Sequence, residues 1–157
     1  AAFGASAVCC LDSSAQALEG VIINAALNGL QDTLTTLRGS APETMAALRT
    51  QGEQFDVVIL DPPAFIQRKK DLKKGITAYR RINELGLHLL RPGGLLVSGS
   101  CSMHLSRADL MTAMQQAAVR AGCQLRVVEQ GAQGPDHPIH PAIPETEYLK
   151  AIFARRV

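Results

Sequence analysis

The stretch FDVVILDPPAF, residues 55–65, constrains the fold of this chain more than any other segment. Four consecutive apolar residues at 57–60, three of them β-branched, predict a central strand of a parallel sheet, buried on both faces. Asp61 follows directly, so its carboxylate is expected at the carboxyl end of the strand, where open α/β sheets bind ligands. The alternative is an ordinary turn in which Asp61 caps the following segment.

The turn after this strand is predicted to be rigid and to carry an aromatic ring. Pro62 biases Asp61 toward an extended backbone, and neither Pro62 nor Pro63 supplies an amide donor. An acid followed by Phe65 suits a flat heterocycle, because the ring can stack on the phenyl group while the acid hydrogen-bonds its edge. The turn therefore favours a pocket for a base.

Composition describes a globular protein of 157 residues, long enough for one domain with a core. Hydrophobic residues make up 46% and charged residues 19%, and no apolar run has the length of a membrane span. The start of the chain does not resemble a secretion signal. Four cysteines lack CxxC and disulfide-framework spacing, which predicts free thiols and a cytoplasmic location: Cys9, Cys10, Cys101 and Cys123.

The net charge of +2 is small, but the basic residues are concentrated. Seven of the sixteen fall within fourteen positions, opposed there only by Asp71: Arg68, Lys69, Lys70, Lys73, Lys74, Arg80 and Arg81. A solvated helical face is the simplest interpretation of such a run. Because it begins three residues after Phe65, a polyanion bound next to the pocket is the more specific hypothesis.

Strand and helix patterns alternate along the chain, which predicts a parallel sheet with crossover helices. The last two strands are joined only by a loop rich in proline and glycine, and we expect them to be antiparallel neighbours. The expected strands are 7–11, 34–38, 57–60, 95–97, 124–129 and 148–153, and the expected helices are 15–27, 42–49, 79–90 and 106–121. Ser106 and Asp109 have the spacing of a capping box.

Two further strand ends carry groups able to do chemistry. Asp12 ends a strand that precedes a helix, as do the acids that bind ribose hydroxyls, although a simple helix cap is an equal alternative. Cys101 follows the strand that runs into Ser98, and packing as a small hydrophobe is its alternative. His104 is expected to be structural, and His137 and His140 lack a third ligand, so no metal site is predicted.

Several motifs, taken in order, resemble the S-adenosylmethionine-dependent methyltransferases, and specifically the bacterial large-subunit ribosomal RNA cytosine-5 methyltransferases. The resemblance covers nearly the whole chain. It rests on VCCLDSSAQAL, NAALNGL, FDVVILDPPAF with the basic segment, LRPGGLLVSGSCSMH and DHPIHPAIPETEYLK. DPP alone is shared by many methyltransferases, whereas its combination with SCS-x-H and PETEYLK is more specific.

This resemblance implies roles for particular residues. Cys101 would be the nucleophile and Asp61 would line the pocket for methyl donor and base. S-adenosylmethionine would be bound by Asp12, Ser13, Ser40, Ala41 and Asp61, with Ser40 standing where such families usually carry an acid. Ribosomal RNA would be bound by Pro62, Phe65, Lys69, Lys70, Lys73, Lys74 and Arg80.

The resemblance also implies a Rossmann-like α/β methyltransferase fold, mostly parallel, with an antiparallel C-terminal strand. Residues 1–157 would form one partial domain that lacks the family's usual first strand, its glycine-rich loop and its N-terminal RNA-binding domain. A homodimer is left open.

The reaction implied is methyl transfer to carbon 5 of cytosine through a cysteine adduct. The alternatives are methylation of an exocyclic base amine, a nicotinamide-dependent oxidoreductase and a noncatalytic RNA-binding fragment.

Overall fold

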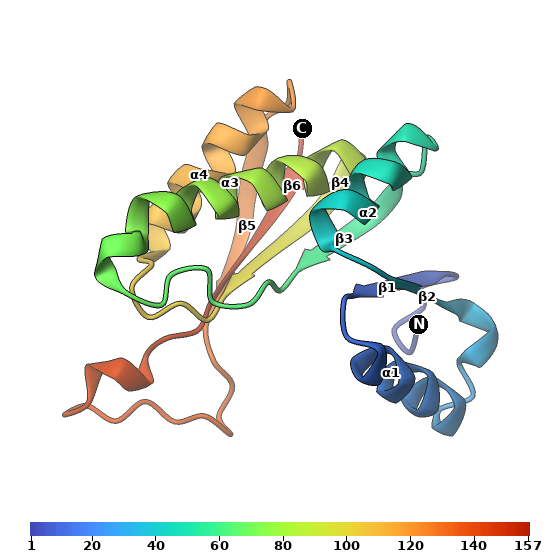
Figure 1. The fold of residues 1–157 in the computed structure, drawn as a ribbon, viewed down its shortest axis with the longest axis horizontal. Coiled ribbons are helices and arrows are strands. Elements are labelled where there is room, and N and C mark those ends of the chain that lie inside the picture. Colours follow the sequence, from blue (N-terminus) through green and yellow to red (C-terminus); the bar gives the residue numbers. More distant parts are fainter. The chain divides into compact units, whose positions relative to one another are not determined.

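A computed structural model describes residues 1–157, which form two compact units, Ala1–Gln51 and Gly52–Val157. Each unit is an α/β arrangement of its own and is described separately (Figure 1). Neither unit contains a helix with both the length and the apolar character needed to cross a membrane.

The first unit contains a two-stranded parallel sheet and two helices. β1 (Val8–Asp12) pairs with β2 (Leu34–Arg38), and α1 (Ala15–Leu27) and α2 (Ala41–Thr50) follow the two strands, with a short helix η1 (Gln31–Thr33) before β2. The boundaries of α1 and β2 agree with those predicted. Ser14 begins α1 because its Oγ accepts a hydrogen bond from the Ala17 amide at 3.2 Å.

The second unit contains a four-stranded mixed sheet in the order β3-β4-β6-β5. β3 (Phe55–Leu60) and β4 (Leu90–Ser100) are parallel, whereas β6 (Lys150–Arg156) is antiparallel to both β4 and β5 (Leu125–Gly131). The predicted antiparallel pairing of the last two strands is therefore confirmed. The loop between them contains one short helix, η3 (Pro144–Thr146).

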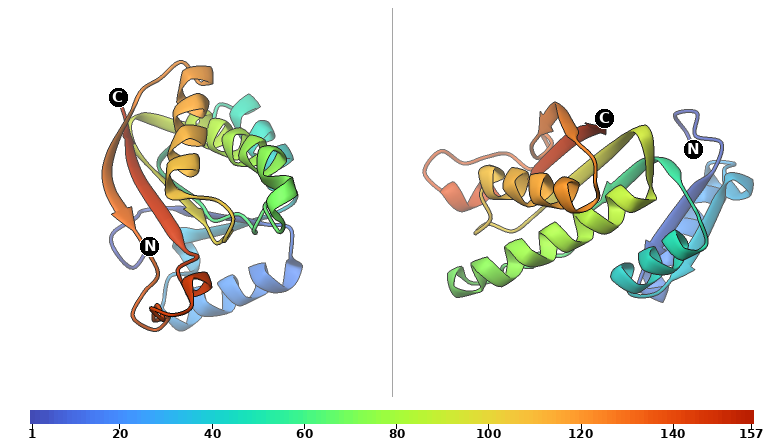
Figure 2. Two further views of the ribbon diagram at one scale, coloured as in Figure 1. Left: turned by 90° about the vertical axis from the view of Figure 1, so that its left-hand side faces the viewer. Right: turned by 90° about the horizontal axis from the view of Figure 1, so that it is seen from above.

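Two helices lie side by side on one face of this sheet, α3 (Leu72–Leu89) and α4 (Arg107–Arg120), as Figures 1 and 2 show. α3 approaches the strands closely at Gly86, where a Cβ atom would lie 3.1 Å from Leu60 and 3.4 Å from Leu96. α4 begins at the predicted capping box, in which Ser106 and Asp109 exchange hydrogen bonds. The core of the unit lies between these helices and the sheet.

The prediction that residues 57–60 form a central strand buried on both faces is wrong. β3 is the edge strand of its sheet, and Val57 and Ile59 are 50% and 70% exposed. Successive strand residues face opposite sides, so Val58 and Leu60 pack under α3 while Val57 and Ile59 face away from it. Hydrophobicity alone does not distinguish a strand covered on one face from one covered on two.

Two elements are longer than predicted. α3 begins at Leu72 rather than near residue 79, after a short helix η2 (Lys69–Asp71), so the basic segment lies on helical structure. β4 begins at Leu90, so the Pro92-Gly93-Gly94 stretch lies within the strand and does not precede it. The pairing register between β3 and β4 shifts at this stretch. Gly93 has a φ of +77°, which explains why this stretch has the composition of a turn.

Candidate active site

Asp61 and Cys101 lie at the carboxyl ends of two strands of the four-stranded sheet. β3 and β4 are parallel with Leu60 opposite Ser98, so Asp61 leaves its strand beside Gly99. A Cβ atom on Gly99 would lie 3.5 Å from a carboxylate oxygen of Asp61. Cys101 follows the last residue of β4. Asp61 and Cys101 therefore follow neighbouring parallel strands at their carboxyl ends.

The segments that follow β3 and β4 are joined by a buried hydrogen bond. The backbone amide of Ile66 donates to Oγ of Ser102 over 3.3 Å. One residue earlier, the ring of Phe65 packs edge-on against Tyr79, with centroids 4.9 Å apart and ring planes at 61°. The turn after β3 is thus held against the segment after β4 and against α3.

A buried polar cluster supports this edge of the sheet, formed by Tyr79, Ser100, Ser102 and Lys150. The Tyr79 hydroxyl lies 2.8 Å from Oγ of Ser100, which donates to it, and 2.9 Å from Oγ of Ser102. The Ser102 amide donates to Oγ of Ser100 over 3.1 Å, and Nζ of Lys150 donates to the Ser102 carbonyl over 2.7 Å. The residues on both sides of Cys101 are therefore fixed by hydrogen bonds.

The Lys150 ammonium is the buried charge of this cluster. Burial lowers its pKa below the usual range, since a charged amine loses hydration there, and the positive charge of Arg107 lowers it further. Cys101 acts in the opposite direction and raises it, because a thiolate attracts the ammonium.

The two groups proposed for chemistry are themselves accessible. Asp61 is exposed and Cys101 is half-buried, so both can meet a ligand. All four cysteines are free, as predicted. Cys10 and Cys123 differ from an ordinary thiol because burial raises the pKa of each, and a charge on Cys9 raises that of Cys10 further.

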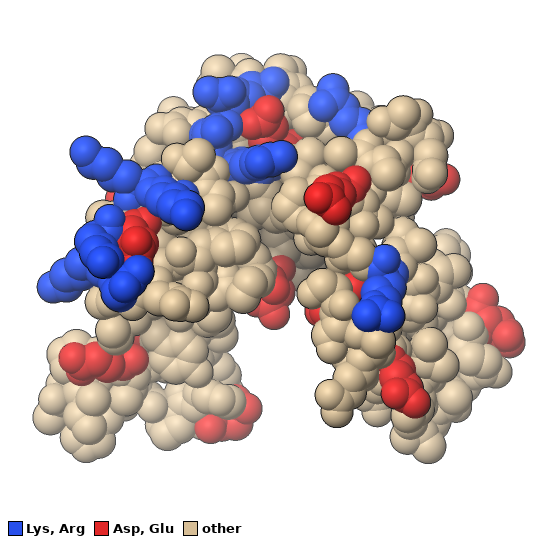
Figure 3. Space-filling view, in the orientation of Figure 1, with Lys and Arg blue, Asp and Glu red and all other residues tan.

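The basic segment is gathered at the start of α3, as Figure 3 shows at the left of the view. Its side chains are not equivalent: Arg68 is paired with Asp71 at 3.0 Å, and Arg80 with Glu84 at 2.8 Å. The Arg80–Glu84 pair is partly buried, with exposures of 18% and 26%, so this arginine is less available to a polyanion than the sequence run suggested. The exposed lysines are Lys69, Lys70, Lys73 and Lys74.

In the first unit, the predicted cofactor residues lie at the carboxyl edge of the two-stranded sheet. Asp12 ends β1 and is exposed, and its carboxylate accepts a hydrogen bond from the Ser14 amide at 2.7 Å. The next strand ends opposite it, and Ser40 and Ala41 begin α2 there, with no side-chain cap from Ser40. Ser13 lies exposed between β1 and α1.

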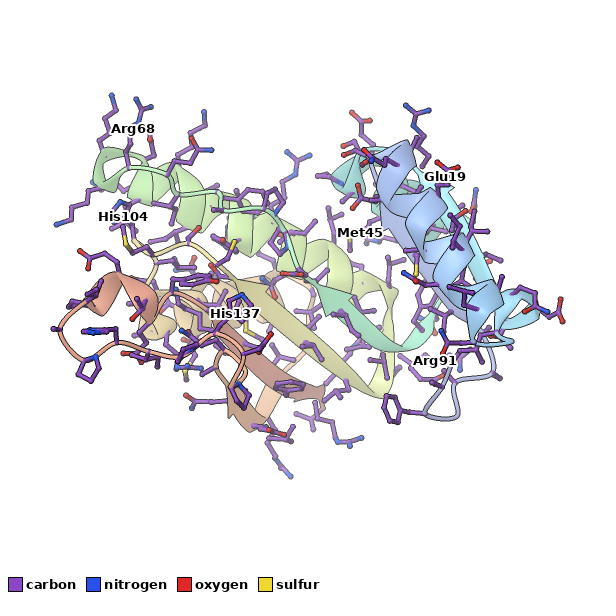
Figure 4. The ribbon with its side chains drawn as sticks, turned by 90° about the horizontal axis from the view of Figure 1, so that it is seen from below. Glu19, Met45, Arg68, Arg91, His104 and His137 are labelled. Atoms are coloured by element: carbon purple, nitrogen blue, oxygen red, sulfur yellow. The ribbon has the colours of Figure 1, made fainter.

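The histidines do not assemble into a metal centre. Nδ1 of His137 lies 3.1 Å from a carboxylate oxygen of Asp136, and Nδ1 of His140 accepts from the Ala142 amide at 3.2 Å, both in the loop between β5 and β6. His104 lies on a different segment, between β4 and α4 (Figure 4). No group of three or more His, Cys, Asp or Glu side chains is arranged to hold a metal ion.

Several solved structures that share this arrangement are described as methyltransferases or their homologs. A protein of Streptococcus mutans classed as an S-adenosylmethionine-dependent methyltransferase superposes with a TM-score of 0.81 at 16% identity, covering 97% of this chain and 39% of that one. A methyltransferase homolog from Pyrococcus horikoshii superposes with a TM-score of 0.69 at 20% identity, covering 96% and 53%. The chain thus has the α/β fold of the S-adenosylmethionine-dependent methyltransferases, as predicted.

The chain belongs to the family described as Conserved hypothetical protein 95, whose profile matches residues 1–105. It is 39% identical over 155 residues to the ribosomal RNA large subunit methyltransferase I of Serratia proteamaculans, which covers 98% of this chain and 39% of that protein. It is 40% identical over 151 residues to a ribosomal RNA large subunit methyltransferase of Deinococcus radiodurans, covering 96% and 36%. The chain therefore spans about two fifths of the length of these relatives.

No sequence pattern predicted the buried polar cluster as a whole. Tyr79 begins a predicted helix and follows the basic motif, and Lys150 lies in a predicted strand and ends the PETEYLK motif. One signal was available for Lys150: along β6 the buried positions are 150, 152 and 154, so alternation from Ile152 and Ala154 directs this lysine inward. No comparable signal connects Tyr79 with Ser100 and Ser102.

Proposed function

We propose that this chain is part of an S-adenosylmethionine-dependent methyltransferase that modifies carbon 5 of a cytosine in large-subunit ribosomal RNA, with Cys101 as the nucleophile. The observation that carries the proposal is the emergence of Asp61 and Cys101 from neighbouring parallel strands, joined by the Ile66–Ser102 hydrogen bond. The names of the relatives from Serratia proteamaculans and Deinococcus radiodurans support the substrate class.

The chemistry requires a sulfur nucleophile because carbon 5 of cytosine is weakly nucleophilic. Addition of the Cys101 thiolate to carbon 6 makes the ring enamine-like, so that carbon 5 can accept a methyl group. Loss of the carbon 5 proton then expels the thiolate. Asp61 supports the adduct by hydrogen-bonding the amino or nitrogen 3 edge of the base, where electron density increases.

The residues of the first unit fit a nucleoside ligand. S-adenosylmethionine, when bound, supplies an electrophilic methyl group on a sulfonium. Asp12 is exposed at a strand end and accepts one short-range hydrogen bond from the Ser14 amide, which leaves a carboxylate oxygen for ribose hydroxyls. Ser13, Ser40 and Ala41 lie at the same edge of that sheet and would complete the cofactor contacts of this unit.

Ribosomal RNA would be held by the turn after β3 and by the basic segment. Pro62 and Phe65 present a rigid apolar surface to the base, and the exposed lysines neutralise phosphates. Arg80 contributes less because Glu84 already pairs with it. Binding is therefore expected to weaken steeply with salt concentration.

The test is a covalent trap. RNA carrying 5-fluorocytidine cannot lose the substituent at carbon 5, so the adduct with the attacking cysteine persists and is seen as a slower band on a denaturing gel. The full-length gene product and its Cys123→Ala variant should form the band with labelled methyl donor, and Cys101→Ala should not. Cys123 is a matched control because it is also a half-buried free thiol.

The outcome for Cys101→Ala separates the candidate reactions. Methylation of RNA at the normal rate by this variant would exclude the cysteine mechanism and favour an exocyclic amine as acceptor. RNA binding with no methylation by the unaltered protein would favour a noncatalytic role.

A further inference from the structure

Tyr79 lies on the interior face of α3 and contacts both segments that carry the proposed active site. It is fully buried, and its ring meets that of Phe65 in the turn after β3, with centroids 4.9 Å apart. Its hydroxyl reaches the end of β4, where it lies 2.8 Å from Oγ of Ser100 and 2.9 Å from Oγ of Ser102. One side chain therefore joins the turn after β3 to the segment that contains Cys101.

The hydroxyl of Tyr79 acts on the two chain neighbours of Cys101. Oγ of Ser100 donates to this hydroxyl and accepts from the Ser102 amide over 3.1 Å. The carbonyl of Ser102 accepts from Nζ of Lys150 over 2.7 Å. Because the residues before and after Cys101 are anchored in this way, the backbone of Cys101 is held too, and the backbone sets the direction of its Cα–Cβ bond.

The turn after β3 is packed on the same part of α3. Ile66 is buried against Gly75, where a Cβ atom would lie only 2.0 Å from Cγ1 of the isoleucine. Gly75 and Tyr79 are four residues apart and so lie on one face of the helix. The Ile66 amide also donates to Oγ of Ser102 over 3.3 Å. Two turns of α3 thus hold the turn after β3, and Tyr79 links it to the end of β4.

Stability alone does not require hydroxyl groups at this place. Tyr79, Ser100 and Ser102 are all buried, and apolar groups of the same shape in place of a buried hydrogen-bonded set can be neutral or stabilising. What hydrogen bonds add is a defined geometry, because each donor needs its acceptor at a set distance and angle. An attacking sulfur needs that definition, since a displacement of about 1 Å can lower a rate about a hundredfold.

We propose that Tyr79 is a positioning residue of the active site, whose hydroxyl fixes Cys101 relative to the Phe65 ring on which the target base stacks. The inference rests on the proposed function, in which the Cys101 sulfur attacks carbon 6 of that base. Tyr79 does not touch the base itself. It acts through Ser100 and Ser102, to which its hydroxyl is bound.

The test begins with Tyr79→Phe in the full-length gene product, because this change removes the hydroxyl and keeps the ring that packs against Phe65. In RNA methylation, kcat should fall about ten- to a hundredfold with little change in KM for RNA, since the RNA contacts remain while the sulfur is no longer aligned. The first-order rate of adduct formation with RNA carrying 5-fluorocytidine should fall by the same factor.

Two further variants separate the hydrogen bonds from packing. Ile82→Val is the control, because it trims a buried side chain of the same helix and breaks no bond to the serines, and its kcat should stay near that of the unaltered protein. Ser100→Ala breaks the same link from the strand and should lower kcat by a factor comparable to Tyr79→Phe. In the double variant the two losses should not add, because both remove one link.

Alkylation of Cys101 by iodoacetamide, without RNA, distinguishes a misplaced sulfur from a loosened fold. A small reagent can approach the thiol from any open direction, so a change of position should leave the rate nearly unchanged, as measured by mass mapping of the Cys101 peptide. Local unfolding would instead expose this half-buried cysteine and raise the rate. Slow methylation by Tyr79→Phe with unchanged alkylation is therefore the result expected for a positioning role.

An unchanged kcat in folded Tyr79→Phe would overturn the proposal, as would an equal loss in Ile82→Val or a large rise in alkylation. Folding is checked by circular dichroism, and Ser100→Ala keeps the test decisive where Tyr79→Phe does not fold. The two proposals fail differently. Absence of a 5-fluorocytidine adduct in the unaltered protein rejects Cys101 as nucleophile, whereas an adduct formed at the same rate by Tyr79→Phe rejects only the role of Tyr79.

Discussion

The two units of this chain hold their proposed functional residues in different ways. In residues 1–51, the buried apolar residues are Leu18, Ala25 and Met45, and the sheet has two strands. All other buried apolar residues, and all buried polar ones, lie in residues 52–157. Asp12 of the first unit is exposed and its partner Ser14 is two residues away, whereas the Ser102 carbonyl is held by a lysine 48 residues distant.

The proposed ligand-binding acid and the proposed nucleophile would need different support. An exposed acid that accepts hydroxyl hydrogen bonds needs only a strand end and a local turn. A nucleophilic sulfur must be aimed at one atom of its substrate, so its backbone has to be held by packing and by hydrogen bonds from several elements. In this chain α3, β4, β6 and the turn after β3 all contribute to that support.

The largest contrast is expected from removing one leucine in each sheet. Leu96→Ala in β4, where the side chain is fully buried, should lower the free energy of unfolding of residues 52–157 by about 2–5 kcal/mol. Leu37→Ala in β2, where the side chain is half-buried, should cost the first unit about half as much. Native-state hydrogen exchange reports each unit separately, and equal losses would show that the two cores are alike.

Removal of the Tyr79 hydroxyl tests the buried cluster. Tyr79→Phe leaves the hydroxyls of Ser100 and Ser102 without this partner and should lower the free energy of unfolding by about 1–3 kcal/mol. Tyr148→Phe is the control on a half-buried tyrosine of the same unit. Denaturant titration measures both, and similar stabilities would mean that the cluster does not hold the edge of the sheet.

The helix caps give a smaller contrast. Ser106→Ala removes both hydrogen bonds of the Ser106 hydroxyl, to the amide and to the carboxylate of Asp109, and should cost about 1–2 kcal/mol, whereas Ser14→Ala removes one bond, to the Ala17 amide, and should cost about 0.5–1 kcal/mol. The order would be reversed if the capping box were not formed in solution. Thermal unfolding of the two variants, compared with that of the unaltered protein, measures both losses of stability.

The two units should not differ in the reactivity of the thiols whose pKa is raised by burial. Burial raises the pKa of Cys10 in the first unit and of Cys123 in the second, so at pH 8 each has less thiolate than a cysteine in a short peptide. Both should be alkylated more slowly than the peptide, with rates that rise with pH. Because the pKa of each thiol is raised in the folded state, its contribution to stability is lost as the pH rises from the unfolded-state pKa to the folded-state pKa. Mass spectrometry of the labelled sites would detect a fast thiol at either position.

Local patterns predicted most elements but not how far they extend. α1 and β2 have their predicted boundaries because caps and turn residues flank them, and the capping box of α4 was recognised for the same reason. α3 was predicted seven residues too short because a lysine-rich first turn has no apolar periodicity. β3 was expected to be central, although apolar residues on its outer face are exposed.

By itself, the sequence determined that Asp61 and Cys101 each follow a strand, because both are adjacent in the chain to apolar runs that form strands. Which strands become neighbours is decided by long-range packing, and so is the register that sets Lys150 opposite Ser100. The burial of Lys150 and its bond to Ser102 therefore exist only in the folded chain. Local propensity acts over a few residues, whereas the pairing of β4 with β6 brings together residues about fifty positions apart.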